Sequence, residues 1–306
     1  MFNKELKPKK IRDRKNIMID SDKVIKVKQE AEKIGRAESD IYNKALDEYL
    51  SKRSSVKILT FLNQKGGCGK TTSVQNICAA LVEKGRKVLC IDLDPQGNLT
   101  KGLGAYNQEA PSIFEVLKGE VLPQDAIVTV HNFDLIPSDM RLSAFEYIEI
   151  PGKELLLKNR LKNLNLTKYD YVVIDCAPSF GKLNLGALSI ATSVYVPMQT
   201  EYYAMEGVTQ LLQTIDLARN ILMNETLDIK GVFATMYNNR RNLDKIVVEK
   251  IEEFFGNKFM KTKIRENVKL AEAPVYKNHI YEYDKKSLGA IDYMNLTEEI
   301  LELEEN

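Results

Sequence analysis

A lysine stands near each end of a glycine-rich segment, KGGCGKTT (65–72), which has the chemistry of a phosphate-binding loop. The segment lies between a predicted strand (56–63) and a helical pattern that starts at residue 70. Glycines let backbone N–H groups converge on phosphate oxygens, and the helix start adds the positive end of its dipole. Lys70 is placed to reach the β- and γ-phosphates of a nucleotide, and the Thr71 hydroxyl to ligate Mg²⁺. The residues expected to contact the nucleotide in this loop are Lys65, Gly66, Gly67, Cys68, Gly69, Lys70, Thr71 and Thr72.

The opening lysine distinguishes this loop from the common form. The usual pattern, GxxxxGK[ST], requires glycine at position 64, where this chain has Gln64. The segment instead matches KGGxGK[ST], and in this it resembles the ParA/MinD group of P-loop ATPases. The resemblance implies that the nucleotide is ATP, and that Lys65 reaches the nucleotide of a partner subunit when two chains enclose ATP. A plain glycine turn is the alternative for this segment.

Two further segments carry carboxylates of the kind that phosphoryl transfer uses. In DLDPQGN (92–98) the resemblance implies that Asp94 orients the attacking water and that Asp92 lies close to the Mg²⁺ ion. The apolar run YVVIDCAPS (171–179) ends in Asp175, as a Walker B carboxylate should. A carboxylate that merely caps a strand is the alternative for Asp175. The predicted catalytic residues are Lys65, Lys70, Asp94 and Asp175, and the predicted Mg²⁺ ligands are Thr71, Asp92 and Asp94.

A C-terminal segment, ENVKLAEAP (266–274), resembles another signature of the ParA group. Its Asn267 matches a residue that contacts the nucleotide in that group. The group usually has proline two positions earlier, where this chain has Arg265, so packing against adenine differs here from the family pattern.

The segment TMYNNRRNL (235–243) resembles the part of ParA/Soj proteins that binds DNA without sequence preference. Arg240 matches the arginine that contributes to this binding, and Arg241 is a candidate supplement. Lys269 matches a second basic position that is commonly arginine. Lysine keeps the charge for a phosphate contact but lacks the bidentate fork of arginine. A solvated helix start with ordinary surface charge is the alternative.

These residues need a sheet whose strand ends bring them together. From residue 56 onward, short β-branched runs alternate with amphipathic stretches. The runs are at 56–63, 87–94, 133–138, 169–177, 193–199 and 229–237, and helical stretches include 70–84, 204–223 and 242–255. This alternation predicts a mostly parallel sheet flanked by helices. With the loop motif, it indicates an α/β P-loop NTPase domain over residues 56–306.

The first 55 residues differ from the rest in charge, since they hold 15 lysines and arginines against 10 aspartates and glutamates. Residues 1–13 read as a basic arm. A half-buried strand is predicted at 16–19, and helices are predicted at 21–35 and 38–50. So small a unit cannot enclose a core alone, which implies dimerisation.

The unit over residues 14–53 resembles the ribbon-helix-helix family, in which two strands pair into a ribbon that enters the DNA major groove. The resemblance implies that Arg14, Asn16 and Met18 face the bases. Arginine and asparagine can make bidentate contacts to purine edges, whereas methionine departs from that chemistry. A helical dimerisation arm with no DNA role is the alternative.

Composition excludes several other classes. No run of 18 apolar residues exists, and no apolar stretch follows the charged N-terminus, so a cytoplasmic protein without a membrane span is expected. The four cysteines form no CxxC pair, and with only His131 and His279 available a histidine-based zinc centre is not expected. The cysteine spacing also differs from that of nitrogenase-reductase-like proteins, which hold an iron–sulfur cluster. The acidic end, LTEEILELEEN, differs from the basic membrane helix of MinD-like proteins.

The resemblance therefore implies a DNA-segregation ATPase of the ParA/Soj type, which partitions a plasmid or a chromosome. An ATP-bound homodimer is expected to bind nucleoid DNA without sequence preference, and a ParB-like partner to stimulate a slow, dimer-dependent hydrolysis. The N-terminal module is expected to add specific binding to an operator or centromere. An ATP-regulated transcription repressor and an ATPase that positions protein cargo remain alternatives.

Overall fold

The computed structural model describes residues 21–44, 56–179 and 181–305. Contacts divide the chain into two compact units, Met1–Arg53 and Ser54–Asn306. The strands of the larger unit are β1 (Lys57–Phe61), β2 (Val88–Leu93), β3 (Val128–Val130), β4 (Phe133–Ile136), β5 (Tyr171–Cys176), β6 (Ser193–Gln199) and β7 (Asp228–Thr235). Its α-helices are α3 (Lys70–Glu83), α4 (Asn98–Gly102), α5 (Ile113–Lys118), α6 (Leu142–Phe145), α7 (Leu156–Leu161), α8 (Lys182–Leu188), α9 (Val208–Ile221), α10 (Asn242–Phe255), α11 (Val268–Glu272), α12 (Ile280–Asp284) and α13 (Leu288–Glu305). Short 3-10 helices are η1 (Pro123–Ala126), η2 (Lys153–Leu155), η3 (Leu166–Lys168), η4 (Gly256–Lys258) and η5 (Ala273–Tyr276).

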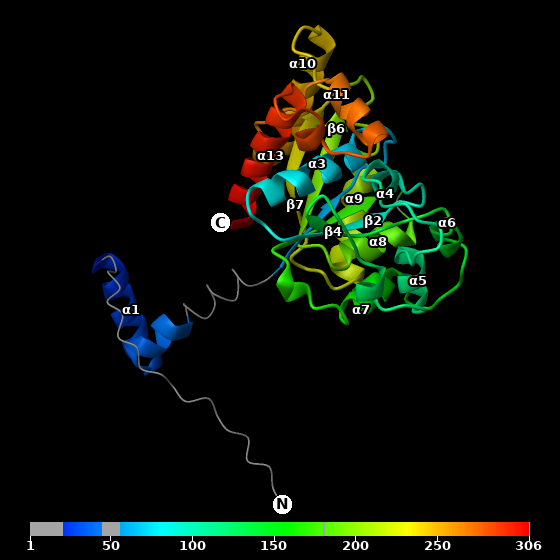
Figure 1. Cartoon of the computed structure of the whole chain (residues 1–306). Helices are drawn as coiled ribbons and strands as arrows, with labels where there is room; N and C mark the ends of the chain where they lie inside the picture. Colours follow the sequence, from blue (N-terminus) through cyan, green and yellow to red (C-terminus); the bar gives the residue numbers. More distant parts are fainter. Residues whose placement is uncertain (1–20, 45–55, 180, 306) are drawn as a thin grey trace, which may run out of the picture. The chain divides into compact units, whose positions relative to one another are not determined.

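Seven strands form one sheet in the order β3-β4-β2-β5-β1-β6-β7 (Figure 1). Every neighbouring pair in this sheet is parallel except β3 and β4, which form an antiparallel hairpin at one edge. The predicted α/β fold with a mostly parallel sheet flanked by helices is confirmed. All six predicted strands are present. The sequence reading missed β3, because its three residues give too short a pattern to stand out from the surrounding loop.

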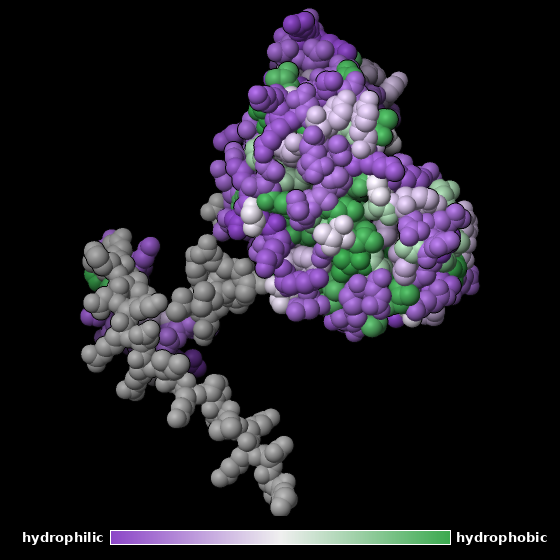
Figure 2. Space-filling view, viewed as in Figure 1, coloured by the Kyte–Doolittle hydropathy of each residue, from purple (hydrophilic) through white to green (hydrophobic). Residues whose placement is uncertain are grey.

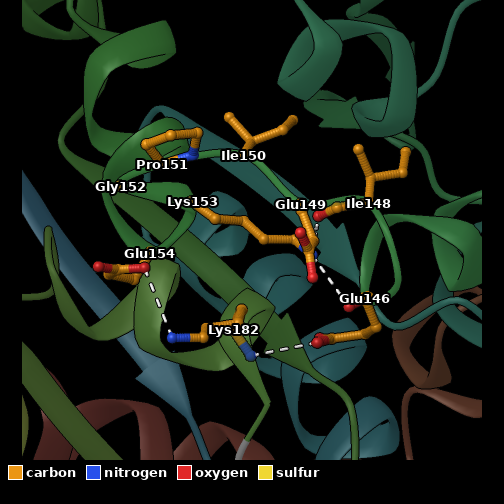
Figure 3. Close-up of a pocket in the computed structure, with 9 residues that line it drawn as sticks. All are labelled: Glu146, Ile148, Glu149, Ile150, Pro151, Gly152, Lys153, Glu154 and Lys182. Carbon is orange, nitrogen blue, oxygen red and sulfur yellow. Dashed lines mark hydrogen bonds and ion pairs between the residues drawn. The ribbon is translucent and has the colours of Figure 1, made fainter.

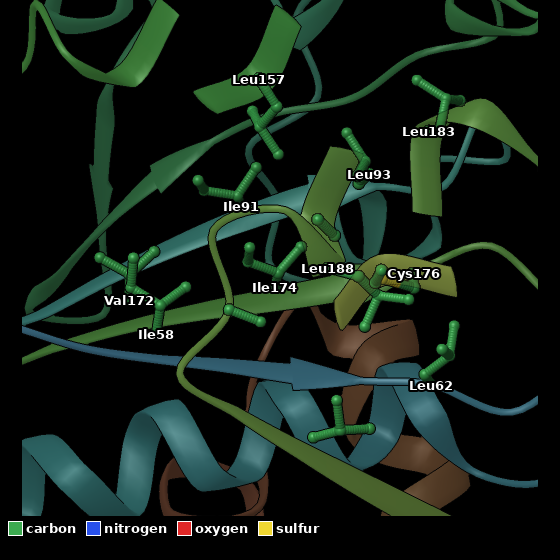
Figure 4. Close-up of a cluster of buried hydrophobic side chains, with 14 of the residues drawn as sticks. Ile58, Leu62, Ile91, Leu93, Leu157, Val172, Ile174, Cys176, Leu183 and Leu188 are labelled. Carbon is green, nitrogen blue, oxygen red and sulfur yellow. The ribbon is translucent and has the colours of Figure 1, made fainter. Parts of the chain in front are cut away.

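The two faces of the sheet bury two separate hydrophobic clusters, because successive strand residues point to opposite sides. Ile58 belongs to the cluster beneath α5, α7, α8, α9 and α10, whereas Leu59 belongs to the cluster beneath α3, α4, α12 and α13. Val172 and Val173 on β5 alternate in the same way. Figure 4 shows the first cluster, in which β1, β2 and β5 project side chains toward α7 and α8. Every residue of β2 and of β5 is buried, so the carboxyl ends of these strands lie in the middle of the domain.

In the smaller unit, α1 (Ser21–Ile34) matches the first predicted helix. Gly35 follows it with a φ of 63°, a conformation that glycine adopts without strain. Residues 38–44, the described part of the second predicted helix, are also helical. The predicted strand at 16–19 lies outside the described residues, so the ribbon-helix-helix assignment stays a prediction.

The visible surface of the larger unit is mainly hydrophilic, with hydrophobic residues in smaller areas (Figure 2). Among the described helices, none is both long enough and apolar enough to cross a membrane.

Candidate active site

The glycine-rich loop joins β1 to α3 at the carboxyl end of the sheet. Gly67 and Gly69 have φ values of 76° and 86°, so both positions favour glycine. Gly69 stands directly before α3, and a Cβ there would meet the Thr235 side chain at 3.6 Å. The Thr235 hydroxyl donates to the Cys68 carbonyl at 2.8 Å and ties the loop to the end of β7. The sheet therefore fixes both the path of the loop and the start of the helix behind it.

A cavity of about 600 Å³ opens over this loop. It is lined by six of the eight loop residues predicted to contact the nucleotide, together with the predicted catalytic Asp94. Its wall is formed by Gly66, Gly67, Gly69, Lys70, Thr71, Thr72, Gln75, Asp94, Gln96, Asn98, Lys101, Gly102, Pro178, Met236, Pro274 and Val275. The backbone N–H groups of the loop and the N-terminus of a 14-residue helix thus face a space that suits a phosphate chain.

Lys70 lies inside the loop, with only 6% of its surface exposed. Its ammonium group donates to the Lys65 carbonyl at 2.9 Å and lies 3.8 Å from the Cys68 sulfur. Burial raises the pKa of the Cys68 thiol, and the neighbouring Lys70 charge opposes that rise. The loop therefore holds the Lys70 cation, buried, beside the cavity.

Lys65 takes a different position, although it belongs to the same loop. Its side chain is not part of the cavity wall, and its ammonium group forms an ion pair with Glu201 at 2.7 Å. Both side chains of this pair are partly exposed, 30% for Lys65 and 41% for Glu201. The structure thus separates the two lysines: Lys70 faces the cavity of its own chain, and Lys65 is held at the surface.

Two buried carboxylates face each other at the ends of β2 and β5, where Asp92 pairs in register with Asp175. Asp92 accepts hydrogen bonds from the Thr100 N–H at 2.9 Å, the Thr100 hydroxyl at 2.7 Å and the Asp94 N–H at 3.2 Å. Burial raises the pKa of Asp92 to about 6, against the opposing effect of these hydrogen bonds. Asp92 is fully buried, and the hydrogen bonds from Thr100 and Asp94 hold its carboxylate in place.

Asp175 has no such support. It is fully buried, and neither of its carboxylate oxygens has a hydrogen-bond partner among the described residues. Burial raises the pKa of Asp175 well above its usual range, and the charge of Asp92 adds to the rise, while the nearby Thr71 and Lys70 oppose it. An unpartnered buried carboxylate beside a threonine hydroxyl and two further carboxylates is an oxygen-rich set of the kind that Mg²⁺ binds. These residues fit a magnesium ion.

Replacing Asp175 with asparagine is expected to stabilise the metal-free protein, because it removes a buried charge that lacks a partner. The melting temperature in the presence of a chelator should rise by roughly 2–10 °C, as measured by differential scanning calorimetry. Asp125→Asn, at an exposed carboxylate, is the matched control and should leave it unchanged. The difference in melting temperature between Asp175→Asn and the parent should become smaller as the pH falls. Protonation of Asp175, whose pKa is raised, also removes the charge in the parent. A lower melting temperature for Asp175→Asn would contradict this account.

Asp94 lies in the turn after β2 and forms part of the cavity wall, with 7% of its surface exposed. Its Oδ1 accepts from the Gln96 N–H at 2.9 Å, and its backbone carbonyl accepts from the Ser138 hydroxyl at 2.8 Å. One carboxylate oxygen is therefore used to hold the turn, and the side chain remains beside the phosphate space. This is the geometry that a residue needs to position a water molecule next to a nucleotide.

Asn267 is not part of the cavity wall. It caps α11, because its side-chain oxygen accepts from the Lys269 N–H at 2.9 Å. Arg265, which replaces the usual proline, binds Asp292 on α13 through its backbone N–H at 2.9 Å and through its guanidinium group. Arg265 therefore has a structural role, since it attaches α13 to the segment that precedes α11.

Three of the residues predicted to bind DNA, Arg240, Arg241 and Lys269, are described and exposed, and they differ in their ion pairs. Arg241 forms an ion pair with Glu266 at 2.9 Å, and Lys269 forms one with Glu272 at 2.9 Å. Arg240 has no ion-pair partner within the described part of the chain. Arg14, Asn16 and Met18 lie outside the described residues.

Several cavity residues escaped the sequence analysis. Pro274 and Val275 come from η5 and Met236 follows β7 with a φ of 53°, although Pro274 and Met236 stand inside segments that the sequence analysis quoted. No sequence motif marked Glu201 as a residue of the site. Its relation to Lys65 arises only from the packing of the turn after β6 against the loop.

A loop of this geometry between β1 and α3, with buried carboxylates at the ends of the neighbouring strands, defines a P-loop nucleotide-binding protein. A family model described as an AAA domain matches residues 56–229. The sporulation initiation inhibitor protein Soj of Bacillus subtilis is 41% identical over 249 residues, which cover 80% of this chain and 98% of that protein. The chromosome-partitioning ATPase Soj of Treponema pallidum is 42% identical over 249 residues, covering 80% and 97%. The chain belongs to the Soj/ParA family of partitioning ATPases, as its sequence motifs predict.

Solved structures agree with this assignment. Cobyrinic acid a,c-diamide synthase from Mycobacterium smegmatis, solved with bound ADP and magnesium, has a TM-score of 0.70 at 35% identity and covers 81% of this chain and 94% of its own. A putative plasmid partition protein from Borrelia burgdorferi bound to AMPPNP has a TM-score of 0.69 at 31% identity, covering 81% and 98%. The ligands of these neighbours agree with the predicted ATP and Mg²⁺.

Proposed function

We propose that this partitioning ATPase works as a dimer switch, in which two ATP-bound chains associate and bind nucleoid DNA without sequence preference. The observation that carries the proposal is the separation of the two loop lysines. Lys70 forms part of the cavity wall of its own chain, whereas Lys65 is outside that wall and forms a partly exposed ion pair with Glu201. A cation in that position can complete the nucleotide site of a second chain. A ParB-like partner then stimulates hydrolysis, which returns the protein to monomers and releases DNA.

The residues of the cavity divide the work of ATP hydrolysis. Lys70 and the loop amides bind the β- and γ-phosphates. Thr71, Asp92 and Asp94 hold Mg²⁺, together with Asp175. The ion, when bound, offsets the phosphate charge. Asp94 orients the attacking water, and Lys65 of the second chain stabilises the charge that gathers on the γ-phosphate. Hydrolysis is therefore slow in the monomer and depends on the dimer.

The pair between Lys65 and Glu201 holds the monomer back from dimerisation, because Lys65 must leave Glu201 before it can reach a second nucleotide. Glu201→Gln removes the charge that retains the lysine. We expect this change to strengthen ATP-dependent dimerisation by about 2–5-fold, as befits a partly exposed ion pair. Sedimentation velocity over a range of protein concentrations measures the dimerisation constant. Glu206→Gln makes the same change at an exposed carboxylate in the same segment and should have no effect. If Glu201→Gln dimerised more weakly while Glu206→Gln did not change, Glu201 would support the dimer, and the proposed inhibition would be wrong.

Arg240 is the principal candidate for phosphate contact, because among the described residues it has no ion-pair partner, whereas Arg241 and Lys269 each pair with a glutamate. Arg240→Ala should weaken binding of the ATP-bound protein to any duplex sequence and reduce the slope of log K against log salt by about one for each arginine lost. Fluorescence anisotropy with a labelled duplex at increasing KCl measures both. The control is Lys230→Ala, which removes an exposed charge at the opposite end of β7. Equal losses of DNA affinity in Arg240→Ala and Lys230→Ala would show that Arg240 has no specific role in DNA binding.

The N-terminal module, residues 14–53, is proposed to bind specific DNA as a dimer. In α1, Val24, Val27 and Ala31 are less exposed than their neighbours, which gives the helix the apolar face that a dimeric module needs. A chain without residues 1–55 separates this function from partition, because a family relative is matched over 98% of its length by 80% of this chain. A partition ATPase keeps ATP-dependent, non-specific DNA binding after the deletion. A transcription repressor that uses ATP only to set its dimer state loses all of it.

A further inference from the structure

The two histidines of the chain lie side by side, although 147 residues separate them in sequence. His131 stands in the turn between β3 and β4, and His279 immediately precedes α12. Their ring centroids are 5.1 Å apart with an interplanar angle of 69°. Because the chain has only two histidines, a histidine-based zinc centre is not expected from the sequence, but the fold brings both residues to one place.

Glu282 completes the cluster from the first turn of α12. One of its carboxylate oxygens lies 2.8 Å from the His131 Nδ1, and the other lies 3.6 Å from the His279 Nε2. One ligand atom from each of the three side chains lies within 4.8 Å of the other two. Two imidazoles and one carboxylate therefore converge on a common point.

The spacing of these atoms matches what a tetrahedral ion requires. Zinc bonds of about 2.0–2.1 Å place neighbouring ligand atoms about 3.3 Å apart, and the two observed separations lie on either side of that value. The same bond length places the centres of two imidazoles on one ion about 5 Å apart, as these two rings are. Only small side-chain movements would bring the three groups to bonding distance.

The tight turn between β3 and β4 positions His131 for this arrangement. His131 and Asn132 have φ values of 47° and 66°, as a two-residue hairpin turn of this hand requires. Asparagine and glycine are the usual residues there, and histidine is one of the few other residues enriched in the left-handed region. The turn brings the His131 imidazole to Glu282 on α12, with its Nδ1 2.8 Å from the carboxylate.

His279 gives an independent observation. It is 5% exposed, and neither of its ring nitrogens makes a hydrogen bond with any residue in the described ranges. A buried imidazole without a hydrogen-bond partner is a group that is incomplete as it stands.

We propose that His131, His279 and Glu282 bind one Zn²⁺ ion, with a water molecule in the fourth position. Imidazole ligands favour zinc and its transition-metal neighbours over Mg²⁺, which prefers oxygen. This site is separate from the oxygen-rich set around Asp175, and the inference is independent of the dimer switch proposed above.

The position of the site links it to the nucleotide cavity. It connects the β3–β4 hairpin to the start of α12, three residues after η5, whose Pro274 and Val275 line the cavity. The same segment is attached to α3, since the Gln75 amide donates to the Asn278 carbonyl at 2.7 Å and the Asn76 side chain accepts from the Ile280 N–H at 2.9 Å. A bound ion thus fastens one wall of the cavity to the edge of the sheet.

Zinc binding by the untagged, full-length chain tests the proposal. The protein is stripped with a chelator, supplied with excess Mg²⁺ to fill oxygen sites, and equilibrated with Zn²⁺ by dialysis followed by elemental analysis. Cobalt in place of zinc reports tetrahedral ligation through its visible absorption. The variants are His131→Asn, which suits the turn because asparagine tolerates positive φ, and Glu282→Gln at a side chain that is 43% exposed. Glu298→Gln on α13, a side chain that is 50% exposed, is the matched control.

The parent and Glu298→Gln are expected to bind one Zn²⁺ per chain, and both site variants to bind it at least tenfold more weakly. Zinc should raise the melting temperature of the parent and not that of His131→Asn. Circular dichroism without metal establishes that each variant is folded, and Glu282→Gln decides the question if the turn variant is not. Equal zinc binding by parent and both variants would overturn the proposal, as would a parent that binds no zinc, since the cluster would then be only a hydrogen-bonded group.

Figure 3 shows the other large cavity, of about 580 Å³, between Glu146 and the start of α8. Lys153 is buried there and donates to the Glu146 carbonyl at 3.0 Å and the Ile148 carbonyl at 2.7 Å. Glu146 in turn accepts from the N–H groups of Lys182 and Leu183. The Lys153 ammonium and the Glu146 carboxylate thus hold the loop in place, so this cavity carries no proposal.

Discussion

A chain in which Lys65 is replaced by alanine should bind ADP as the parent does, fail to dimerise with ATP, and hydrolyse ATP about 10²–10³-fold more slowly. The cavity of each chain keeps Lys70, the loop amides and Asp94, so nucleotide binding by the monomer stays intact. What is lost is the cation that a second chain supplies to the γ-phosphate. ADP affinity follows from titration calorimetry, dimerisation from sedimentation velocity, and turnover from phosphate release.

Lys84→Ala is the matched control for this change. Lys84 is another partly exposed lysine that pairs with a carboxylate, Glu298, but it lies at the far end of α3 from the loop. Its loss should leave dimerisation and turnover unchanged. Normal turnover in Lys65→Ala would exclude a role for Lys65 across the dimer.

Replacing Asp94 with alanine should have the opposite effect on association, because it stops hydrolysis without removing ATP. The cavity keeps Lys70 and the loop amides, and Thr71, Asp92 and Asp175 remain as proposed Mg²⁺ ligands, so the ATP-bound dimer forms and persists. Turnover should fall by about 10²–10⁴-fold, as expected when a group that positions the nucleophile is lost. Light scattering after addition of ATP and Mg²⁺ follows the dimer over time.

Asp94→Asn distinguishes the charge of this residue from its structural role. The amide oxygen can still accept from the Gln96 N–H that holds the turn, so the loop keeps its shape. Both variants are expected to give a persistent dimer. A dimer that decays at the rate of the parent in Asp94→Asn would show that the carboxylate is not needed for hydrolysis.

The sequence predicted the parts of this site that depend on local pattern. The loop from Lys65 to Thr72 can be predicted because its glycines, Lys70 and the following helix are consecutive in the sequence. The structure places them around one cavity. The pairing of Asp92 with Asp175 depends instead on the register of two strands that are far apart in the chain. The α/β alternation predicts a mostly parallel sheet but not the order of its strands, so this pairing could not be predicted. Nor could the sequence show that the Asp175 carboxylate has no hydrogen-bond partner among the described residues.

The contacts that the sequence could not provide are those between distant segments. Glu201 lies 136 positions from Lys65, and no local pattern marks it as the partner of that lysine. Arg265 departs from the family pattern, and only the structure shows that it binds Asp292. Asn267 matches a nucleotide contact, yet its side chain caps a helix because the backbone of α11 begins there. Such roles are set by tertiary packing.

Mixing two inactive variants tests the central claim most directly. Lys65→Ala keeps its own cavity but gives no lysine to a partner, whereas Asp94→Ala gives Lys65 but cannot hydrolyse its own ATP. In a mixed dimer, the site of the Lys65→Ala chain has its own Asp94 and receives Lys65 from the other chain. The mixed dimer also keeps one of the two lysines that association needs, so Lys65→Ala chains enter it although they do not pair with one another. Phosphate release by an equal mixture should therefore rise above the sum of the two variants, toward roughly a quarter of the parent rate, which is the value for random pairing of chains. A rate no higher than the sum of the two variants measured separately would contradict a lysine that acts across the dimer.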